Sequence, residues 1–372
     1  MHRVLLLGAG KIGRMVAWFL ARTGEYDVLV ADYDAQALLR IKKQSDVLTK
    51  QGDATSPTEL QKIMRGHDSV ISALSYNFNP LIAKIAVEAG LNYFDLTEDV
   101  MTTRKVRETA ANTKADQIVM PQCGLAPGFI SIAANYLTKS FDSLDTVRMR
   151  VGALPQFPSN AMKYNLTWST DGLINEYCNP CEAIHNDRRI EILPLEGLEH
   201  FSLDGVRYEA FNTSGGLGTL CETMEGRVRE LNYKTIRYVG HCELMSFLVN
   251  ELHLNRKRET LKRILEEAVP VTFQDVVVVF CTVTGQRRGQ LVQYSDAKKI
   301  YSETIDGEAW SAIQITTAAA VCAALDMHVA EKLPRSGFVR QEDIDYEQFL
   351  ENRFGCYYKT ESSTRFSNME NA

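Results

Sequence analysis

Three glycines near the start of the chain have the type and spacing that hold a phosphate group. Gly8, Gly10 and Gly13 form a G-x-G-x-x-G pattern between the strand-like run 3–7 and the helix-like stretch 15–21. The first glycine permits a tight turn, the second lets the backbone approach a pyrophosphate, and the third lets the helix pack closely on the strand. The start of the helix adds N–H groups and a positive dipole end. The pattern predicts a dinucleotide-binding turn, and its alternative is a purely structural glycine turn.

An acidic residue stands where the ribose of such a cofactor is expected. Asp32 ends a second strand-like run, 28–31, and lies 19 residues after Gly13. Its carboxylate can accept hydrogen bonds from both adenosine ribose hydroxyls and would repel a 2′-phosphate. The next residue is Tyr33 rather than an arginine. We therefore expect NAD as the cofactor, with NADP as the alternative.

Further cofactor contacts are expected in the loops that follow strand ends. Asp53 comes after the third strand-like run, and its alternative role is a turn or N-cap aspartate. Residues 72–77 follow the fourth run and should face the nicotinamide. Beyond the three glycines and Asp32, the predicted cofactor residues are Lys11, Ile12, Asp53, Ala73 and Leu74.

Three acidic residues follow the fifth strand-like run. We predict that Asp95 is catalytic, because its strand-end position points into the crevice where ligands of such sheets bind. Glu98 is predicted to bind substrate, and Asp99 is a further candidate. The alternative for Glu98 and Asp99 is an acid cluster at the start of a helix.

The elements that must position these residues alternate between strand and helix. Helix-like patterns at 57–64 and 81–88 lie between the strands, which predicts a doubly wound parallel sheet of the Rossmann type. The six strand-like runs are 3–7, 28–31, 46–50, 68–74, 91–96 and 117–121.

The rest of the chain has a different character and predicts a second α+β domain with a mixed, largely antiparallel sheet. After a helix at 129–138, the expected strands are 147–154, 208–211, 234–239, 271–283 and 290–294. We expect a hairpin loop at 282–289 and a helix at 307–326 that returns to the first domain. The predicted divisions are 1–128 (dinucleotide-binding), 129–305 (substrate and dimerisation), 306–350 (returning segment) and 351–372 (polar tail).

Composition excludes several classes of protein. The 372 residues carry 41 Lys and Arg against 47 Asp and Glu, a net charge of −6, so no basic excess predicts nucleic-acid binding. We expect no membrane span and no signal peptide, since no apolar run approaches about 18–20 residues. Eight scattered cysteines favour reduced thiols and the cytoplasm. Cys178 and Cys181 form one Cys-x-x-Cys pair, which is too few ligands for zinc, and we expect no metal.

Several stretches together resemble the saccharopine dehydrogenase superfamily over about residues 1–350. The branch with the greatest resemblance is that of the bacterial lysine 6-dehydrogenases. The stretches that carry the resemblance are the glycine turn and residues 67–73, 123–128, 212–216, 233–241 and 333–338. The resemblance implies a discontinuous Rossmann domain, a second α+β domain, a nicotinamide cofactor, an amino-acid substrate and a homodimer.

The implied reaction is the oxidation of a carbon that bears an amine. The favoured example is oxidative deamination of the side-chain amine of L-lysine to 2-aminoadipate 6-semialdehyde. One alternative is a saccharopine dehydrogenase of the glutamate-forming type, and another is a nicotinamide-binding protein without turnover. Glutamate-forming relatives have an arginine for a substrate carboxylate where this chain has Asp171. The substitution disfavours saccharopine, which has three carboxylates.

The resembling stretches supply the remaining site residues. Arg237 is predicted to bind the substrate carboxylate through its planar guanidinium, and Lys234 and His241 are predicted to be catalytic. On a strand, Arg237 shares a face with Thr235 and is opposite Lys234. Residues Tyr76 and Cys123 are predicted to line the nicotinamide side of the substrate pocket.

Overall fold

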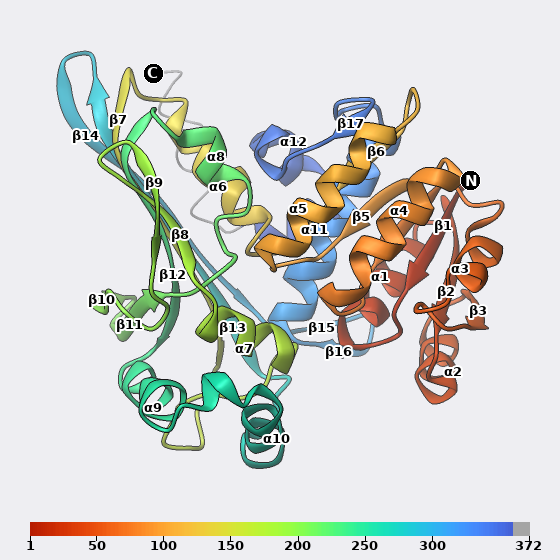
Figure 1. Ribbon diagram of the computed structural model, residues 1–372, viewed down its shortest axis with the longest axis horizontal. Coiled ribbons are helices and arrows are strands. Elements are labelled where there is room, and N and C mark those ends of the chain that lie inside the picture. Colours follow the sequence, from red (N-terminus) through yellow and green to blue (C-terminus); the bar gives the residue numbers. More distant parts are fainter. Residues whose placement is uncertain (360–372) are drawn as a thin grey trace. The chain divides into compact units, whose positions relative to one another are not determined.

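The computed structural model describes residues 1–359, and the chain divides into two compact units (Figure 1). The first unit comprises Met1–Phe129 and Thr317–Phe354, and the second begins at Ile130, runs to Thr316 and resumes at Gly355. Residues 351–358, predicted as tail, are folded: α12 (Tyr346–Glu351) is followed by a 3-10 turn at Gly355–Tyr358. The remainder of the predicted tail, 360–372, lies outside the described residues.

The first unit contains a seven-stranded parallel sheet in the order β17-β6-β5-β4-β1-β2-β3. The order reverses between β1 and β4, which is the switch point where ligands bind in doubly wound folds. The predicted fold class of this part is confirmed. The strands are β1 (His2–Leu7), β2 (Tyr26–Asp32), β3 (Leu48–Gln51), β4 (Ser69–Ser72), β5 (Asn92–Asp95), β6 (Ile118–Met120) and β17 (Gly337–Phe338).

The helices of this unit begin at the residues that their capping chemistry favours. At α3, Ser56 is the N-cap, Pro57 is the first helical residue, and the Ser56 hydroxyl accepts a hydrogen bond from the Glu59 N–H. Besides α12, the helices are α1 (Lys11–Ala21), α2 (Ala35–Gln44), α3 (Pro57–Met64), α4 (Asn79–Ala89), α5 (Val100–Thr109) and, from Thr317 onward, α11 (Ala312–Val329).

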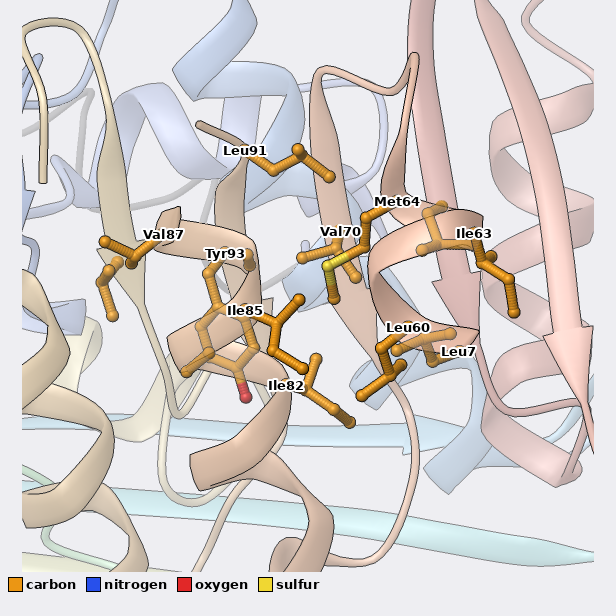
Figure 2. Packing of buried hydrophobic residues seen from close by; sticks show 14 of the residues in the cluster. Leu7, Leu60, Ile63, Met64, Val70, Ile82, Ile85, Val87, Leu91 and Tyr93 are labelled. Carbon is orange, nitrogen blue, oxygen red and sulfur yellow. The ribbon is translucent and has the colours of Figure 1, made fainter. Parts of the chain in front are cut away.

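A buried apolar cluster fixes the strand ends from one face of the sheet. Figure 2 shows side chains of α3 and α4 packed on those of β1, β4 and β5. The labelled members are Leu7, Leu60, Ile63, Met64, Val70, Ile82, Ile85, Val87, Leu91 and Tyr93. Each fully buried aliphatic side chain contributes about 1.5–3 kcal/mol to stability, so the cluster holds the carboxyl ends of these strands in place.

The second unit contains an eight-stranded sheet in the order β10-β11-β12-β7-β13-β14, with β8 and β9 joined beside β12. Its pairs are antiparallel except for the parallel pair of β12 and β7. The mixed, largely antiparallel sheet is confirmed. The eight strands are β7 (Ser143–Pro155), β8 (Cys181–His185), β9 (Arg188–Ile192), β10 (Glu199–Leu203), β11 (Val206–Asn212), β12 (Val228–Tyr238), β13 (Asp275–Arg287) and β14 (Gln290–Tyr301). A separate two-stranded sheet is formed by β15 (Glu303–Ile305) and β16 (Glu308–Trp310).

Two predictions in this unit are wrong, and both errors fall at tight hairpins. Residues 282–287, which were expected in a loop, belong to strand β13. The chain turns at Arg288 and Gly289 alone, both of which have positive φ. The expected helix at 307–326 begins later, at Ala312, because residues 303–310 form a second hairpin. Besides α11, which begins here, the helices are α6 (Phe129–Thr138), α7 (Thr170–Cys178), α8 (Leu220–Met224), α9 (His241–Ser246) and α10 (Arg258–Ala268).

Helix α11 is long and apolar enough to cross a membrane by length and composition. It is however a mostly buried helix: 78% of its 18-residue window lies inside the protein, as in the core helix of a globular domain. No other helix within residues 1–359 meets the same test.

Candidate functional site

The glycine turn between β1 and α1 needs two of its three glycines for packing. Gly8 has φ +108°, and a Cβ there would lie 2.8 Å from the carbonyl oxygen of Ala73. A Cβ on Gly13 would lie 1.9 Å from the carbonyl oxygen of Gly8. A Cβ on Gly10, by contrast, would meet no protein atom within 4 Å. The space beside Gly10 is therefore open, as the approach of a phosphate group requires.

The start of α1 and the end of β2 complete this turn. Helix α1 has Gly10 as its N-cap and no side-chain cap, so its dipole end faces the turn without a competing acceptor from an N-cap side chain. Asp32 Oδ2 accepts a hydrogen bond from the Ala9 N–H at 2.6 Å, and Oδ1 accepts one from the Asp34 N–H at 2.8 Å. These bonds hold the carboxylate against the glycine turn, where a ribose would lie. The residues present fit a nicotinamide dinucleotide.

The other predicted cofactor residues have different surroundings. Ala73 donates its N–H to Leu7 O at 2.8 Å and lies against Gly8, as does the side chain of Leu74. Lys11 and Ile12 are the first two residues of α1. Asp53 is exposed, and its Oδ1 accepts bonds from the N–H and hydroxyl of Thr55, which lower its pKa. The turn alternative for Asp53 therefore describes its local contacts, and its contact with cofactor stays a prediction.

The predicted catalytic Asp95 is fully buried at the end of β5. Its carboxylate accepts hydrogen bonds from the Tyr93 hydroxyl at 2.8 Å and from the N–H groups of Thr97 and Gln122, each at 2.9 Å. Burial raises the pKa of Asp95, and these bonds oppose that shift. Such a carboxylate joins the loops after β5 and β6, and its catalytic role stays a prediction.

Asp99, Glu98, Cys123 and Tyr76 lie near strand ends of the same sheet. Asp99 is the N-cap of α5 and accepts from the Thr102 N–H at 2.7 Å, so the helix-start alternative holds for it. Glu98 directly precedes this cap and is half-buried, as is Tyr76. Cys123 is buried, donates to Met120 O at 3.1 Å, and has its pKa raised by burial, so its thiol is protonated.

In the second unit, Arg237 is the centre of a buried group of polar side chains. From β12 its Nε donates to the Tyr177 hydroxyl at 2.9 Å, and its Nη1 donates to the hydroxyl of Thr235 at 2.7 Å and to Ile236 O at 2.9 Å. The guanidinium carbon lies 5.0 Å from the ring centre of Tyr164. The shared face of Arg237 and Thr235 agrees with strand alternation. These contacts fix the orientation of the guanidinium.

A chain of hydrogen bonds runs from Arg237 to the start of α9. The Tyr177 hydroxyl lies 3.0 Å from His241 Nε2, and His241 Nδ1 lies 2.9 Å from Met162 O. Because Tyr177 accepts from Arg237, it donates to Nε2, which assigns the imidazole proton to Nδ1. Burial, with the charge of Arg237, lowers the pKa of His241 to about 3. His241 is therefore neutral near pH 7 and hydrogen-bonded to Tyr177, and its catalytic role stays a prediction.

Glu176 and Tyr164 complete this group, and the sequence analysis identified neither of them. The Glu176 side chain is 10% exposed, and its Oε2 lies 3.8 Å from Arg237 Nη2. Burial raises the pKa of Glu176 to about 7, and Arg237 opposes the shift. The sequence carries no local signal for this, since the burial of Glu176 in α7 is visible only in the structure. We call Tyr164, Glu176, Tyr177, Arg237 and His241 the Arg237 cluster.

Lys234 lies outside the Arg237 cluster. As expected from alternation it is on the opposite face of β12, where its ammonium is 2.8 Å from Glu199 Oε2 and also contacts Gly197 O. Glu199 is shared with Arg150. The structure therefore separates Lys234 from Arg237 and His241, three residues that the sequence analysis grouped.

Asp171 does not face the Arg237 cluster either. It lies in the first turn of α7, and its Oδ2 accepts from Lys262 Nζ of α10 at 2.7 Å. This half-exposed ion pair gives Asp171 a structural partner, so the inference that it repels a substrate carboxylate has no support in the geometry. Within residues 1–359 no group of three or more His, Cys, Asp and Glu side chains is placed to hold a metal, and Cys178 and Cys181 are free thiols.

Comparison with protein families gives matches over almost all of the described chain. Residues 4–120 match the model of the saccharopine dehydrogenase NADP binding domain, and residues 124–352 match that of the saccharopine dehydrogenase C-terminal domain.

Curated relatives are distant in sequence. Mitochondrial alpha-aminoadipic semialdehyde synthase of Rattus norvegicus is 22% identical over 311 residues, which are 77% of this chain and 31% of that protein. The chain thus spans about a third of the length of that relative. Saccharopine dehydrogenase (NADP(+), L-glutamate-forming) of Saccharomyces cerevisiae is 23% identical over 322 residues, 82% of this chain and 69% of that protein.

Two solved structures share the fold over nearly the whole chain. Apo saccharopine dehydrogenase (L-Glu forming) from Saccharomyces cerevisiae gives a TM-score of 0.78 at 18% identity, covering 95% of this chain and 98% of that one. Homospermidine synthase from Legionella pneumophila in complex with NAD gives a TM-score of 0.67 at 14% identity, covering 96% of this chain and 89% of that one.

Proposed function

Because the chain belongs to the saccharopine dehydrogenase family, we propose that it is a nicotinamide-dependent oxidoreductase that acts on a carbon–nitrogen bond of an amino acid. The observation that carries the proposal is the pairing of two features within one chain. The first unit has a glycine turn whose open side is at Gly10, and the second has a buried guanidinium held in place by Tyr177 and Thr235.

The first unit would hold the cofactor through backbone and carboxylate contacts. The N–H groups at the start of α1 would bind the pyrophosphate, and the Asp32 carboxylate would accept from the ribose hydroxyls. When bound, a nicotinamide dinucleotide accepts a hydride from the carbon that bears the amine. Asp32 supports NAD, because its charge opposes a 2′-phosphate. NADP is the alternative, and it is the cofactor named for the yeast relative.

The favoured substrate is L-lysine or a close analogue, oxidised at the side-chain amine. Saccharopine has three carboxylates, and each needs cationic or N–H partners. The Arg237 cluster supplies one guanidinium, with the Glu176 carboxylate 3.8 Å from it. That charge balance supports a substrate with a single carboxylate. The second candidate is oxidation of saccharopine to yield glutamate, which the names of the relatives favour.

The substrate amine must lose its proton before a hydride can leave, since an ammonium has no electron pair to donate. A free lysine amine has a pKa of about 10.4. Asp95 is buried with its hydrogen bonds made, and His241 is neutral and bonded to Tyr177. Because both side chains are already engaged within the protein, we expect turnover to rise toward alkaline pH, where the free amine is more abundant.

The test is initial-rate absorbance of the reduced nicotinamide, with NAD or NADP, across L-lysine, saccharopine, ornithine and arginine at alkaline pH. We expect turnover with L-lysine and a preference for NAD. Turnover with saccharopine alone would establish the second candidate. Nicotinamide binding without turnover on any amine would contradict the proposal and leave a non-catalytic binding protein.

A further inference from the structure

The carboxylate of Glu176 is buried without the hydrogen bonds that such a group needs. Its Oε2 is inaccessible and accepts no hydrogen bond within residues 1–359. The nearest cationic atom is Arg237 Nη2 at 3.8 Å, which is beyond hydrogen-bond distance. Buried carboxylates in folded proteins are almost always paired or hydrogen-bonded. The arrangement is therefore incomplete without a further donor.

The geometry around Arg237 differs from that of a structural ion pair in the same unit. Arg150 and Glu199 make a two-pronged contact, in which Nε and Nη2 each donate to a carboxylate oxygen. Arg237 instead donates from Nε to the Tyr177 hydroxyl and from Nη1 to the Thr235 hydroxyl and the backbone. Its Nη2 is the nitrogen nearest to Glu176, but the two do not form a hydrogen bond. The guanidinium is thus oriented by neutral groups, and its remaining donor edge is directed toward Glu176.

Neutral hydroxyls with unmet hydrogen bonds accompany the two charges. The Tyr164 hydroxyl is buried and makes no hydrogen bond of full geometry in the described chain, only weak contacts with the side chains of Trp168 and Thr167. Thr213 Oγ1 is also buried without a hydrogen-bond partner in the described chain. Tyr164 lies beneath the Arg237 guanidinium. Thr213 precedes Ser214, whose N–H donates to Glu176 O at 3.0 Å. Hydroxyls both donate and accept, so these two can bond either a carboxylate or an ammonium.

We propose that Glu176 and Arg237 together bind the α-ammonium and α-carboxylate of a free amino acid. Arg237 Nη2 donates to the substrate carboxylate, and the Glu176 carboxylate accepts from the substrate ammonium. This inference rests on the proposed function, and it adds the substrate class: a zwitterionic amino acid whose reacting amine is on the side chain.

Charge balance separates this head group from other ligands. At the alkaline pH of the turnover assay, Glu176 is ionised and the facing pair has one positive and one negative charge. A zwitterion then leaves no charge uncompensated, whereas a simple carboxylate or a simple amine does. Glu209 is the other carboxylate on this face, being the cross-strand partner of Arg237. It is already used, because it accepts from the N–H groups of Gly240 at 2.8 Å and Cys242 at 2.6 Å. Glu176 is the carboxylate of the pair that is left for a ligand.

The binding experiment uses ligands that cannot react. L-norleucine has the head group without a side-chain amine, hexanoate lacks the ammonium, and pentylamine lacks the carboxylate. Titration calorimetry on the whole protein, with and without NAD, should show norleucine binding at least ten-fold tighter than either partial ligand. Equal affinity for all three ligands would overturn the proposal, and this result needs no variant.

The variants assign the ammonium to Glu176. Glu176→Gln keeps the shape and removes the charge. We expect it to weaken norleucine binding by about 10- to 100-fold, while hexanoate binds at least as tightly as to the wild type, because a like charge has been removed. Asp171→Asn is the matched control, because it removes a carboxylate from the same helix that faces Lys262 instead, and it should bind norleucine like the wild type. Equal losses of norleucine and hexanoate in Glu176→Gln would contradict the assignment.

Turnover distinguishes this inference from the proposed function. If L-lysine is a substrate, Glu176→Gln should raise its KM by a similar factor. The amine substrate ε-aminocaproate, which lacks the α-ammonium, should keep its wild-type KM in the same variant. Lysine turnover with no change in the ratio of these two KM values would retain the proposed function and reject the head-group site. Norleucine binding that depends on Glu176, without turnover of any amine, would retain the head-group site and reject the proposed function.

Discussion

The glycine turn of the first unit and the Arg237 cluster of the second are both close-packed arrangements. They differ in how far apart their residues lie in the sequence. The turn lies within six consecutive residues, 8–13, and its partner Ala73 follows a neighbouring strand. In the cluster, Tyr177 and Arg237 are 60 positions apart and Tyr177 and His241 are 64 apart. A local arrangement leaves a pattern in the sequence, whereas one assembled from a loop, a helix and a strand leaves isolated residues of ordinary type.

The largest expected effects come from substitutions in the glycine turn, where Gly13 and Gly10 have different surroundings. Gly13→Ala places a methyl group 1.9 Å from a backbone oxygen, so we expect a loss of about 3 kcal/mol or more in the free energy of unfolding. Gly10→Ala meets no protein atom, and it should cost less than about 1 kcal/mol while weakening NADH binding at least ten-fold. Urea unfolding and NADH fluorescence titration measure the two effects. Wild-type stability in Gly13→Ala would contradict the packing role.

The next largest effect concerns the pH dependence of stability in the ligand-free protein. Burial raises the pKa of Glu176 from 4.5 to about 7, so the folded protein keeps a proton that the unfolded chain releases. This contribution to stability is complete below about pH 4.5 and is lost as the pH rises through about 7. The difference is about 3 kcal/mol. The other titratable groups that interact with Glu176 are neutral, which leaves Arg237 as the opposing charge; they are Tyr164, Tyr177, Cys181 and Tyr233.

Urea unfolding at pH 5 and pH 8 tests this effect with the Glu176→Gln variant. The variant lacks the titrating group, so it should gain stability relative to the wild type at pH 8 and show little difference at pH 5. Asp171→Asn is the control for removing a carboxylate from α7. A wild type and Glu176→Gln with parallel pH profiles would show that Glu176 titrates normally.

The smallest expected effect is that of Asp171→Asn, which tests whether Asp171 lies outside the substrate site. The ion pair of Asp171 and Lys262 is partly exposed on both sides, so Asp171→Asn should change the free energy of unfolding by less than about 1 kcal/mol. Its KM for L-lysine should equal that of the wild type. A change in the preference between lysine and saccharopine would mean that the first turn of α7 contacts the substrate after all.

The fold of the first unit could be predicted because its signals are local. The apolar run of β1 and the glycines after it predict strand and turn, and α3 begins at Ser56 and Pro57 as capping chemistry dictates. In the second unit, the hairpin before β14 was predicted with too long a loop, because Arg-Gly at 288–289 is a weaker turn signal than Asn-Gly or Asp-Gly. Asp306 and Gly307 did carry that stronger signal, but the apolar residues that follow them favoured a helix.

The site could be predicted only in part. Asp32 and the glycines follow from spacing, and Arg237 from the resemblance of residues 233–241 to the family. Glu176 and Tyr164 could not be found in this way, since their significance lies in burial next to Arg237 and no local pattern reports burial of that kind. His241 and Asp95 were identified by residue type, but their protonation and hydrogen bonds depend on neighbours that the sequence does not place.

The seventh strand of the first sheet has a consequence for synthesis. Strand β17 pairs with β6, and Gln341 donates to Pro121 O from 220 positions later in the chain (Figure 1). At roughly 5–20 residues per second, the ribosome needs on the order of ten to forty seconds to supply that partner. During this interval the outer edge of β6 has unpaired N–H and C=O groups, which are a template for pairing with other chains. The ribosome makes residues 130–316 of the second unit while that edge lacks its partner strand, so a chaperone that covers β6 would act in this interval.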